Sequence, residues 1–154
     1  MTRSGRAGIG AAMVLAYPDD SAIAAVAVGV LGRSLPHAAW THAAHFAAAL
    51  WLTRHQPGFE GPRDMPAIIR GYNEAVGTPN TDSYHHTITL ASLRAVDAAL
   101  AANEDAPLHI ILDAILAGPC GQSNWLMAHW SRDRMFGVAA RRDWRAPDLA
   151  PLPF

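Results

Sequence analysis

The alanine-rich segment HAAWTHAAHFAAALWLTRH, at residues 37–55, favours one long helix. Leu35-Pro36 precedes the segment and Pro57-Gly58 follows it, and both pairs are typical of helix boundaries. Similar segments recur along the chain between glycine and proline positions, and no window shows the alternation of a half-buried strand. The sequence therefore predicts an all-α protein.

Further helices are predicted wherever an apolar segment lies between turn-forming residues. They are expected at about residues 20–31, 65–76, 84–102, 108–117 and 123–136. A proline-rich C-terminal tail after Gly137 is expected to lie extended over these helices. We thus predict a single bundle of five to six helices over residues 21–154, preceded by an N-terminal extension at residues 1–20.

The composition excludes several classes of function. All 12 basic residues are arginine, and 13 acidic residues bring the net charge to −1. This balance argues against nucleic acid or an anionic membrane as the main partner, because both call for a basic patch. The lack of lysine excludes Schiff-base, pyridoxal-phosphate and Walker-type chemistry. Cys120 is the only cysteine, which excludes an internal disulfide and a multi-thiolate metal site, and we interpret it as structural.

The N-terminus bears a superficial likeness to a secretion signal. Arg3 and Arg6 precede a mildly apolar run at residues 7–16. The run is short and rich in alanine and glycine, and no stretch of about 20 apolar residues is present. The sequence therefore predicts a cytoplasmic protein without a membrane span.

Two histidines of the 37–55 segment are the first candidate site residues. His42 and His45 lie three residues apart, which places them on one helix face at roughly 60° from each other. Phe46 and Leu50 belong to the apolar side of the same helix, and His42 falls near the centre of that side. A buried imidazole needs a partner for each nitrogen. Metal binding satisfies that need, and so do hydrogen bonds to backbone or tyrosine; both alternatives stay open.

A second pair, His85 and His86, begins the helix expected at 84–102. The apolar positions of that helix leave one of the two imidazoles pointing inward but do not choose between them. Together with His42 and His45, the inward histidine of this pair makes a three-histidine constellation, which suits a divalent transition metal: Zn, Fe, Ni or Cu.

Other polar residues surround these histidines in the sequence. Glu74 and Asp82 are candidate catalytic residues, as a general base or as partners that orient an imidazole N–H; solvated loop acids are the alternative. Arg132 is a candidate clamp for an anionic ligand, the alternative being a surface salt bridge with Asp133 or Asp82. The remaining candidates for substrate binding are Trp40, Tyr72, Asn80 and Tyr84.

Several motifs resemble a family of small bacterial all-α proteins of unassigned function. They are Trp40-Thr41-His42-x-x-His45, Tyr72-Asn73-Glu74-Ala75-x-Gly77-Thr78-x-Asn80-Thr81-Asp82, Tyr84-His85-His86-Thr87, and a C-terminal set of Ser131-Arg132, Ala140-Arg141 and Pro147-Asp148-Leu149-x-Pro151-Leu152-Pro153. The resemblance covers most of the chain from Leu35 onward. It favours His85 over His86 as a ligand but supplies no reaction. The positions that it implies to be important are His42, His45, the Tyr84-His85-His86 block, Asn80, Asp82 and Arg132.

Two functions follow from these residues. The first is a metal-dependent enzyme, a hydrolase, isomerase or lyase, in which the metal activates water or polarises a carbonyl of a small, acidic substrate. The second is a non-enzymatic protein that binds a small molecule in the same histidine-lined pocket. A third hypothesis is an interaction protein that pairs, for example as a homodimer, through an exposed apolar helix.

Overall fold

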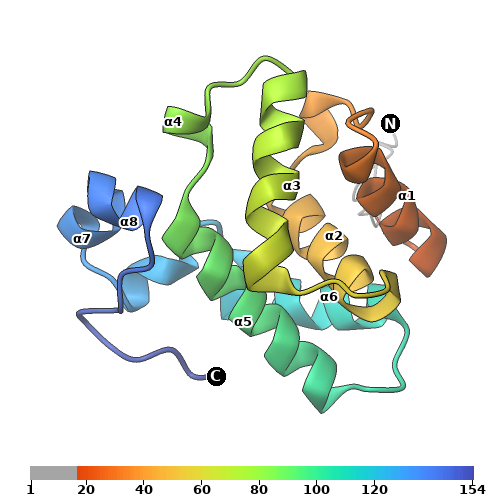
Figure 1. Ribbon diagram of the computed structural model, residues 1–154. Helices are drawn as coiled ribbons and strands as arrows, with labels where there is room; N and C mark the ends of the chain where they lie inside the picture. The colour runs from red at the N-terminus through yellow and green to blue at the C-terminus, as the bar shows by residue number, and fades with distance from the viewer. Residues whose placement is uncertain (1–16) are drawn as a thin grey trace, which may run out of the picture.

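The computed structural model describes residues 17–154, and all regular secondary structure within them is helical (Figure 1). The secretion-like run at residues 7–16 lies outside this range. Five helices form the body of the molecule: α1 (Asp20–Leu31), α2 (His42–His55), α3 (Gly61–Ala75), α5 (His86–Ala102) and α6 (Leu108–Ala117). The short helices are α4 (Asn80–Ser83), α7 (Arg132–Phe136) and α8 (Val138–Arg142), and 3₁₀ turns cover His37–Ala39, Pro119–Gly121 and Trp125–Ala128.

Helix α2 is the centre of the bundle. It packs against α1, α3, α5 and α6, while α7 and α8 lie on the opposite side of the molecule from α1 (Figure 1). Almost every residue of α2 from Ala44 to Leu52 is buried, which is the condition of a helix that is apolar all round. Its many alanines are small, so neighbouring helices approach it closely, and the all-α prediction from residues 37–55 is confirmed.

The predicted start of this helix was too early. Residues 37–39 form a separate 3₁₀ turn, and α2 begins at His42. Thr41 is extended, and its side chain accepts a hydrogen bond from the Ala44 amide at 3.2 Å. Such an N-cap satisfies one of the free amides of a first turn and fixes the start of a helix.

Helix α3, in contrast, begins four residues before the predicted Met65. Pro62 stands in its first turn, where a missing amide hydrogen has no cost, and the Asp64 carboxylate accepts from the Glu60 amide at 2.8 Å. At its end Gly77 adopts a φ of +76°, which glycine tolerates far better than other residues. The Thr78 amide then bonds back to the Asn73 carbonyl at 2.9 Å.

The predicted helix at 123–136 is wrong. The chain there divides into the 3₁₀ turn at Trp125–Ala128 and helix α7. Ser131 stands between them, and its amide and hydroxyl both donate to the Asp148 carboxylate, at 2.7 and 2.6 Å. Residues 143–154 have no regular structure, and the Trp130 indole N–H donates to the Arg145 carbonyl at 2.8 Å. The Ser131 amide is thereby used by the tail, whereas a continuous helix would need it for its own hydrogen bonds.

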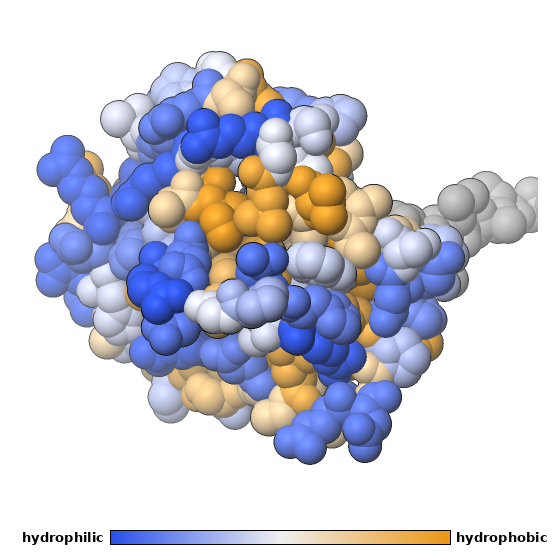
Figure 2. All heavy atoms as spheres, turned by 45° about the vertical axis from the view of Figure 1, so that its right-hand side comes forward, coloured by the Kyte–Doolittle hydropathy of each residue, from blue (hydrophilic) through white to orange (hydrophobic). Residues whose placement is uncertain are grey.

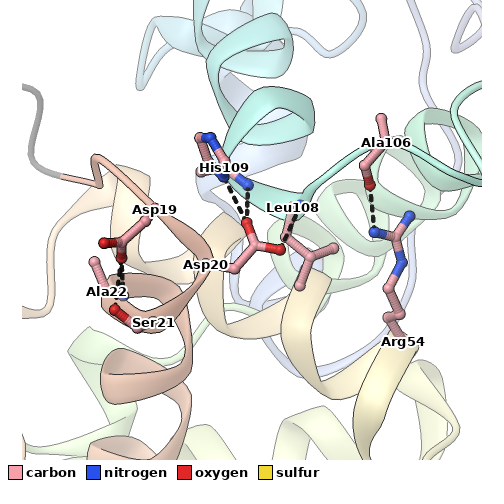
Figure 3. A network of polar contacts seen from close by, with 8 residues as sticks. All are labelled: Asp19, Asp20, Ser21, Ala22, Arg54, Ala106, Leu108 and His109. Carbon is pink, nitrogen blue, oxygen red and sulfur yellow. Dashed lines mark hydrogen bonds and ion pairs between the residues drawn. The ribbon is translucent and has the colours of Figure 1, made fainter.

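The half-buried carboxylate of Asp20 joins the start of α1 to the start of α6 (Figure 3). Asp20 accepts from the amides of Leu108 (3.1 Å) and His109 (2.8 Å) and from the His109 ring at 2.7 Å. Partial burial works to raise the pKa of Asp20, but these donors together hold it below its ordinary value. Nearby, the Arg54 guanidinium donates to the Ala106 carbonyl at 2.6 Å and fixes the loop before α6.

The surface is largely hydrophilic, with apolar side chains gathered near the middle of the face in Figure 2. Among the exposed apolar side chains of the described chain are Val28 and Leu31 of α1. No helix within residues 17–154 has both the length and the apolar character that crossing a membrane requires.

Candidate functional site

A chamber of about 200 Å³ lies between α2, α3 and α5, with Ser123 and the start of the 3₁₀ turn at Trp125–Ala128 at its edge. Its walls are mainly apolar. Most of the lining comes from Phe46, Ala49, Met65, Ile69, Ile88, Leu93, Val96 and Trp125, and the polar lining comes from His42, His45, Thr89, Ser92 and Ser123.

His42 enters this chamber from the first turn of α2. Its Nε2 lies 2.7 Å from the carbonyl oxygen of Cys120. Since a carbonyl oxygen only accepts, Nε2 carries the proton and Nδ1 of the neutral ring is an acceptor. Phe46 packs edge-on to the ring with centroids 5.3 Å apart.

His45 has the opposite tautomer. Its Nδ1 donates to the Thr41 carbonyl at 2.7 Å, which leaves Nε2 as the acceptor. The ring stacks on Trp40 with centroids 3.8 Å apart. Burial lowers the pKa of His45 most, the hydrogen bond to Thr41 opposes that effect, and nearby His42 lowers the pKa further. His45 is therefore neutral at neutral pH.

A second cavity, of about 290 Å³, adjoins the chamber. Four residues line both: His45, Ile69, Ile88 and Thr89. We call the second cavity the mouth; its remaining lining is Asp82, Ser83, Tyr84, His85, Phe136 and Arg141.

His85 reaches the mouth but has both ring nitrogens engaged. As the N-cap of α5, its Nδ1 accepts from the Ile88 amide at 3.2 Å, and its Nε2 donates to the Met135 carbonyl at 2.6 Å. Burial lowers the pKa of His85, against the bond to Met135. In this conformation the ring offers no lone pair to a metal ion.

His86 lines neither cavity. Its Nδ1 lies 2.8 Å from the Tyr84 hydroxyl, and its pKa is lowered first by burial and then by Arg70. The structure thus brings His42 and His45 to one chamber and His45 and His85 to the adjoining mouth. All four rings have the backbone or tyrosine partners that the non-metal alternative expects.

The candidate acids lie in different surroundings. Glu74 lies in the last turn of α3, and Asn80 is the first residue of α4. The Asn80 side-chain amide donates to the Arg70 carbonyl (3.3 Å) and to Glu74 (3.4 Å) and accepts from Asn73 (3.1 Å). Neither residue lines the chamber or the mouth, so their hydrogen bonds support the turn. Asp82 does line the mouth, and its backbone carbonyl accepts from Arg141 at 3.0 Å.

The candidate aromatic residues pack next to the histidines and their cavities. Tyr72 is buried, donates its hydroxyl to the Leu35 carbonyl at 2.8 Å and packs edge-on to Trp40 at 5.5 Å. Trp40 in turn fixes the plane of His45. Tyr84 is buried beside the mouth, with the Arg70 guanidinium 4.2 Å above its ring.

Arg132 lines neither cavity and lies exposed over the Phe136 ring, 5.3 Å from its centroid. The alternative of a salt bridge with Asp133 or Asp82 is wrong, because no such ion pair occurs in the part of the chain that the structure describes.

Sequence analysis missed several residues of the site. Thr89 and Ser92 lie one turn apart on α5, on the face shared with Val96, and their helical spacing was a usable signal. The Cys120 carbonyl carries no local signal, because it meets His42 from 78 positions away. Arg141 belongs to one of the motifs that resemble the family, but nothing near it in the sequence indicated that it meets Asp82, 59 positions away.

Within residues 17–154, no group of three or more His, Cys, Asp and Glu side chains is placed to hold a metal ion. Comparison with known proteins gives no match to a family model, a curated protein or a solved structure.

Acidification is expected to destabilise the fold over the range below pH 6.5. His45, His85 and His86 all have pKa values below their ordinary 6.5 when folded. Between those values and 6.5 the unfolded chain binds protons that the folded chain does not, so stability present at pH 7 is lost as pH falls. Urea unfolding at pH 7 and pH 5 measures the loss. Replacing His45 by Gln should flatten the dependence, whereas replacing the exposed His55 by Gln should not; equal stability at both pH values would contradict the assignment.

Proposed function

We propose that the protein binds a small, largely apolar molecule in the chamber, where the free ring nitrogens of His42 and His45 accept hydrogen bonds from it. The observation that carries this proposal is the lining itself, an apolar cavity with a few convergent polar groups, which is the usual form of a small-molecule site.

The two histidines support the proposal through their fixed tautomers. Each donates its only ring N–H to a backbone carbonyl, so Nδ1 of His42 and Nε2 of His45 are left as acceptors. No side-chain nitrogen or oxygen in residues 17–154 is both fully buried and unpartnered. These acceptor nitrogens are therefore accessible, and a ligand with an N–H or O–H group would satisfy them.

Filling the chamber is expected to weaken binding. The neutral fluorophore N-phenyl-1-naphthylamine combines an apolar body with one N–H donor, and we expect saturable binding of one molecule per chain. Ala49 lies on the chamber wall, so Ala49→Leu occupies its space and should weaken binding by about ten-fold or more. Ala25→Leu, on the exposed side of α1, is the matched control and should bind as the wild type does. Binding that is not saturable, or that Ala49→Leu leaves unchanged, contradicts the proposal.

A metal-dependent enzyme is the second candidate, and one specific observation favours it. Histidines that bind metal commonly donate their other ring N–H to a carbonyl, as His42 and His45 do here. The two acceptor nitrogens would hold a divalent Zn, Fe, Ni or Cu ion, which would supply Lewis acidity for hydrolase, isomerase or lyase chemistry. Asp82 at the mouth, rather than Glu74, would assist proton transfer.

Metal content separates the two candidates. Untagged protein is offered each of these ions, dialysed and analysed for metal per chain. If the histidines are ligands, His42→Ala should lose the metal and His55→Ala should keep it, and affinity should fall as pH drops through about 6.5. A folded wild type that takes up no ion excludes this candidate and leaves the binding protein.

A further inference from the structure

We infer that the natural ligand is an apolar monocarboxylic acid, with its body in the chamber and its carboxylate in the mouth against Arg141. This inference rests on the proposed function of the chamber and names the class of molecule that it takes.

The first support is that the two cavities share part of their lining. His45, Ile69, Ile88 and Thr89 line both, so these side chains are what a molecule longer than the chamber would have to pass to reach the mouth. The chamber lining contains no Asp, Glu or Arg, whereas the mouth contains Arg141 and Asp82. The combined site therefore has an apolar end and a charged end.

The second support is the unneutralised charge of Arg141. Its Nη1 donates to a backbone carbonyl, that of Asp82, and no ion pair of Arg141 occurs within residues 17–154. The remaining guanidinium N–H groups suit a carboxylate, which an arginine binds through two parallel hydrogen bonds.

The position of Arg141 is fixed from the bundle side. Thr87 of α5 is fully buried, and its hydroxyl lies 2.7 Å from the carbonyl oxygen of Ala140 and 2.8 Å from that of Asp143. The Arg145 amide donates to the same hydroxyl at 3.1 Å. Helix α8 is thereby held against α5, and Arg141 is half-buried at the mouth rather than free in solvent.

The Asp82 carboxylate acts against an anionic ligand, since it also lines the mouth. His85 adds no donor, because its ring N–H is used by Met135. Arg141 is therefore the group that binds the carboxylate, and removal of the Asp82 charge should strengthen binding.

The test compares octanoate with the neutral octanamide by isothermal titration calorimetry at pH 7.5, on the full chain. Wild type should bind octanoate about ten-fold more tightly than octanamide. Arg141→Gln should remove this difference by lowering the affinity for octanoate, and octanamide binding that remains shows that the variant is folded. Arg142→Gln, on the same helix but exposed and outside both cavities, makes the same charge change and should preserve the difference. Asp82→Asn should increase it.

The outcomes distinguish the inference from the proposed function. If octanamide binds and octanoate binds no better, or if Arg141→Gln keeps the preference, the acid inference is overturned and the apolar chamber stands. If neither compound binds but N-phenyl-1-naphthylamine does, the acid inference is overturned and the apolar chamber stands. If N-phenyl-1-naphthylamine does not bind either, the proposed function fails and the inference fails with it.

Discussion

Replacing Gly121 with alanine is expected to lower the free energy of unfolding by about 3 kcal/mol, the upper part of the range for overpacking. Gly121 ends the 3₁₀ turn at Pro119–Gly121. A Cβ there would collide with the carbonyl oxygen of Leu116 and lie 2.8 Å from its carbonyl carbon and 3.2 Å from its Cα. All three atoms belong to the backbone of α6. The clash therefore cannot be relieved by rotating a side chain, and the backbone itself would have to shift.

The same substitution should disturb the chamber. Cys120, the neighbour of Gly121, provides the carbonyl that accepts from His42 at 2.7 Å. Moving the turn lengthens that bond and frees the ring to change tautomer. Urea unfolding measures the stability, and nitrogen NMR of the imidazole of His42 reports the tautomer.

Gly118→Ala is the matched control in the same turn. Its added Cβ would lie 3.5 Å from the carbonyl oxygens of Ala114 and Ile115, which is ordinary contact, and Gly118 has a negative φ. It should change the stability by less than about 1 kcal/mol. A Gly121→Ala protein with the stability of Gly118→Ala and an unchanged His42 spectrum would refute this account of the turn.

The helix boundaries that were predicted well are set by residues close to them in the sequence. Helix α1 begins beside Asp19, whose side chain accepts from the Ala22 amide at 3.0 Å, and ends at Gly32. Helix α6 lies between Pro107 and Gly118-Pro119, and its predicted bounds match the structure. Caps and breakers act within a few residues of the boundary they define, so a sequence shows them directly.

The segment at 123–136 was mispredicted because its determinants are remote. Helical spacing alone favoured one continuous helix there. Asp148, which is 17 residues after Ser131, holds the amide and hydroxyl at the break. Tertiary contacts of this kind override local propensity, and the intervening sequence gives no sign of them.

The residues of the candidate site likewise divide into those that local sequence patterns predicted and those that depend on remote contacts. Helical periodicity alone placed His42 and His45 on one face, and both line the chamber. It did not choose between His85 and His86, because the choice depends on the Met135 carbonyl, fifty residues further along. Asn80, in the motif from Tyr72 to Asp82, was a candidate for substrate binding. In the structure its side chain forms hydrogen bonds that close a turn.

Trp130→Ala is expected to lower the free energy of unfolding by about 4 kcal/mol, as large-to-small substitutions of buried aromatic residues do. Trp130 has no exposed surface and packs in a second core cluster with Ala91, Trp125, Leu126 and Met135. Trp144 packs edge-on to its ring, with centroids 5.8 Å apart. Truncation leaves a cavity in this cluster and also leaves the Arg145 carbonyl without its indole donor at 2.8 Å.

Trp130→Ala should raise the rate of amide hydrogen exchange more in the C-terminal tail than in the helices of the bundle. The Leu149 amide donates to the His129 carbonyl at 2.9 Å, so its hydrogen exchange reports directly on attachment of the tail. We expect this amide to exchange much faster in Trp130→Ala. The amides of α2 should exchange faster only to the extent that the global stability falls. The tail and α8 both depend on the cluster around Trp130, so octanoate binding should weaken as well.

Phe136→Ala is the matched control for stability. Phe136 is also a large aromatic residue of this region, but 51% of it is exposed, so its truncation should cost less than about 1 kcal/mol. Urea unfolding of both variants compares a buried aromatic side chain with an exposed one in the same part of the chain. If Trp130→Ala costs no more than Phe136→Ala, the second cluster does not hold the C-terminal region. The position of Arg141 at the mouth would then depend on Thr87 alone.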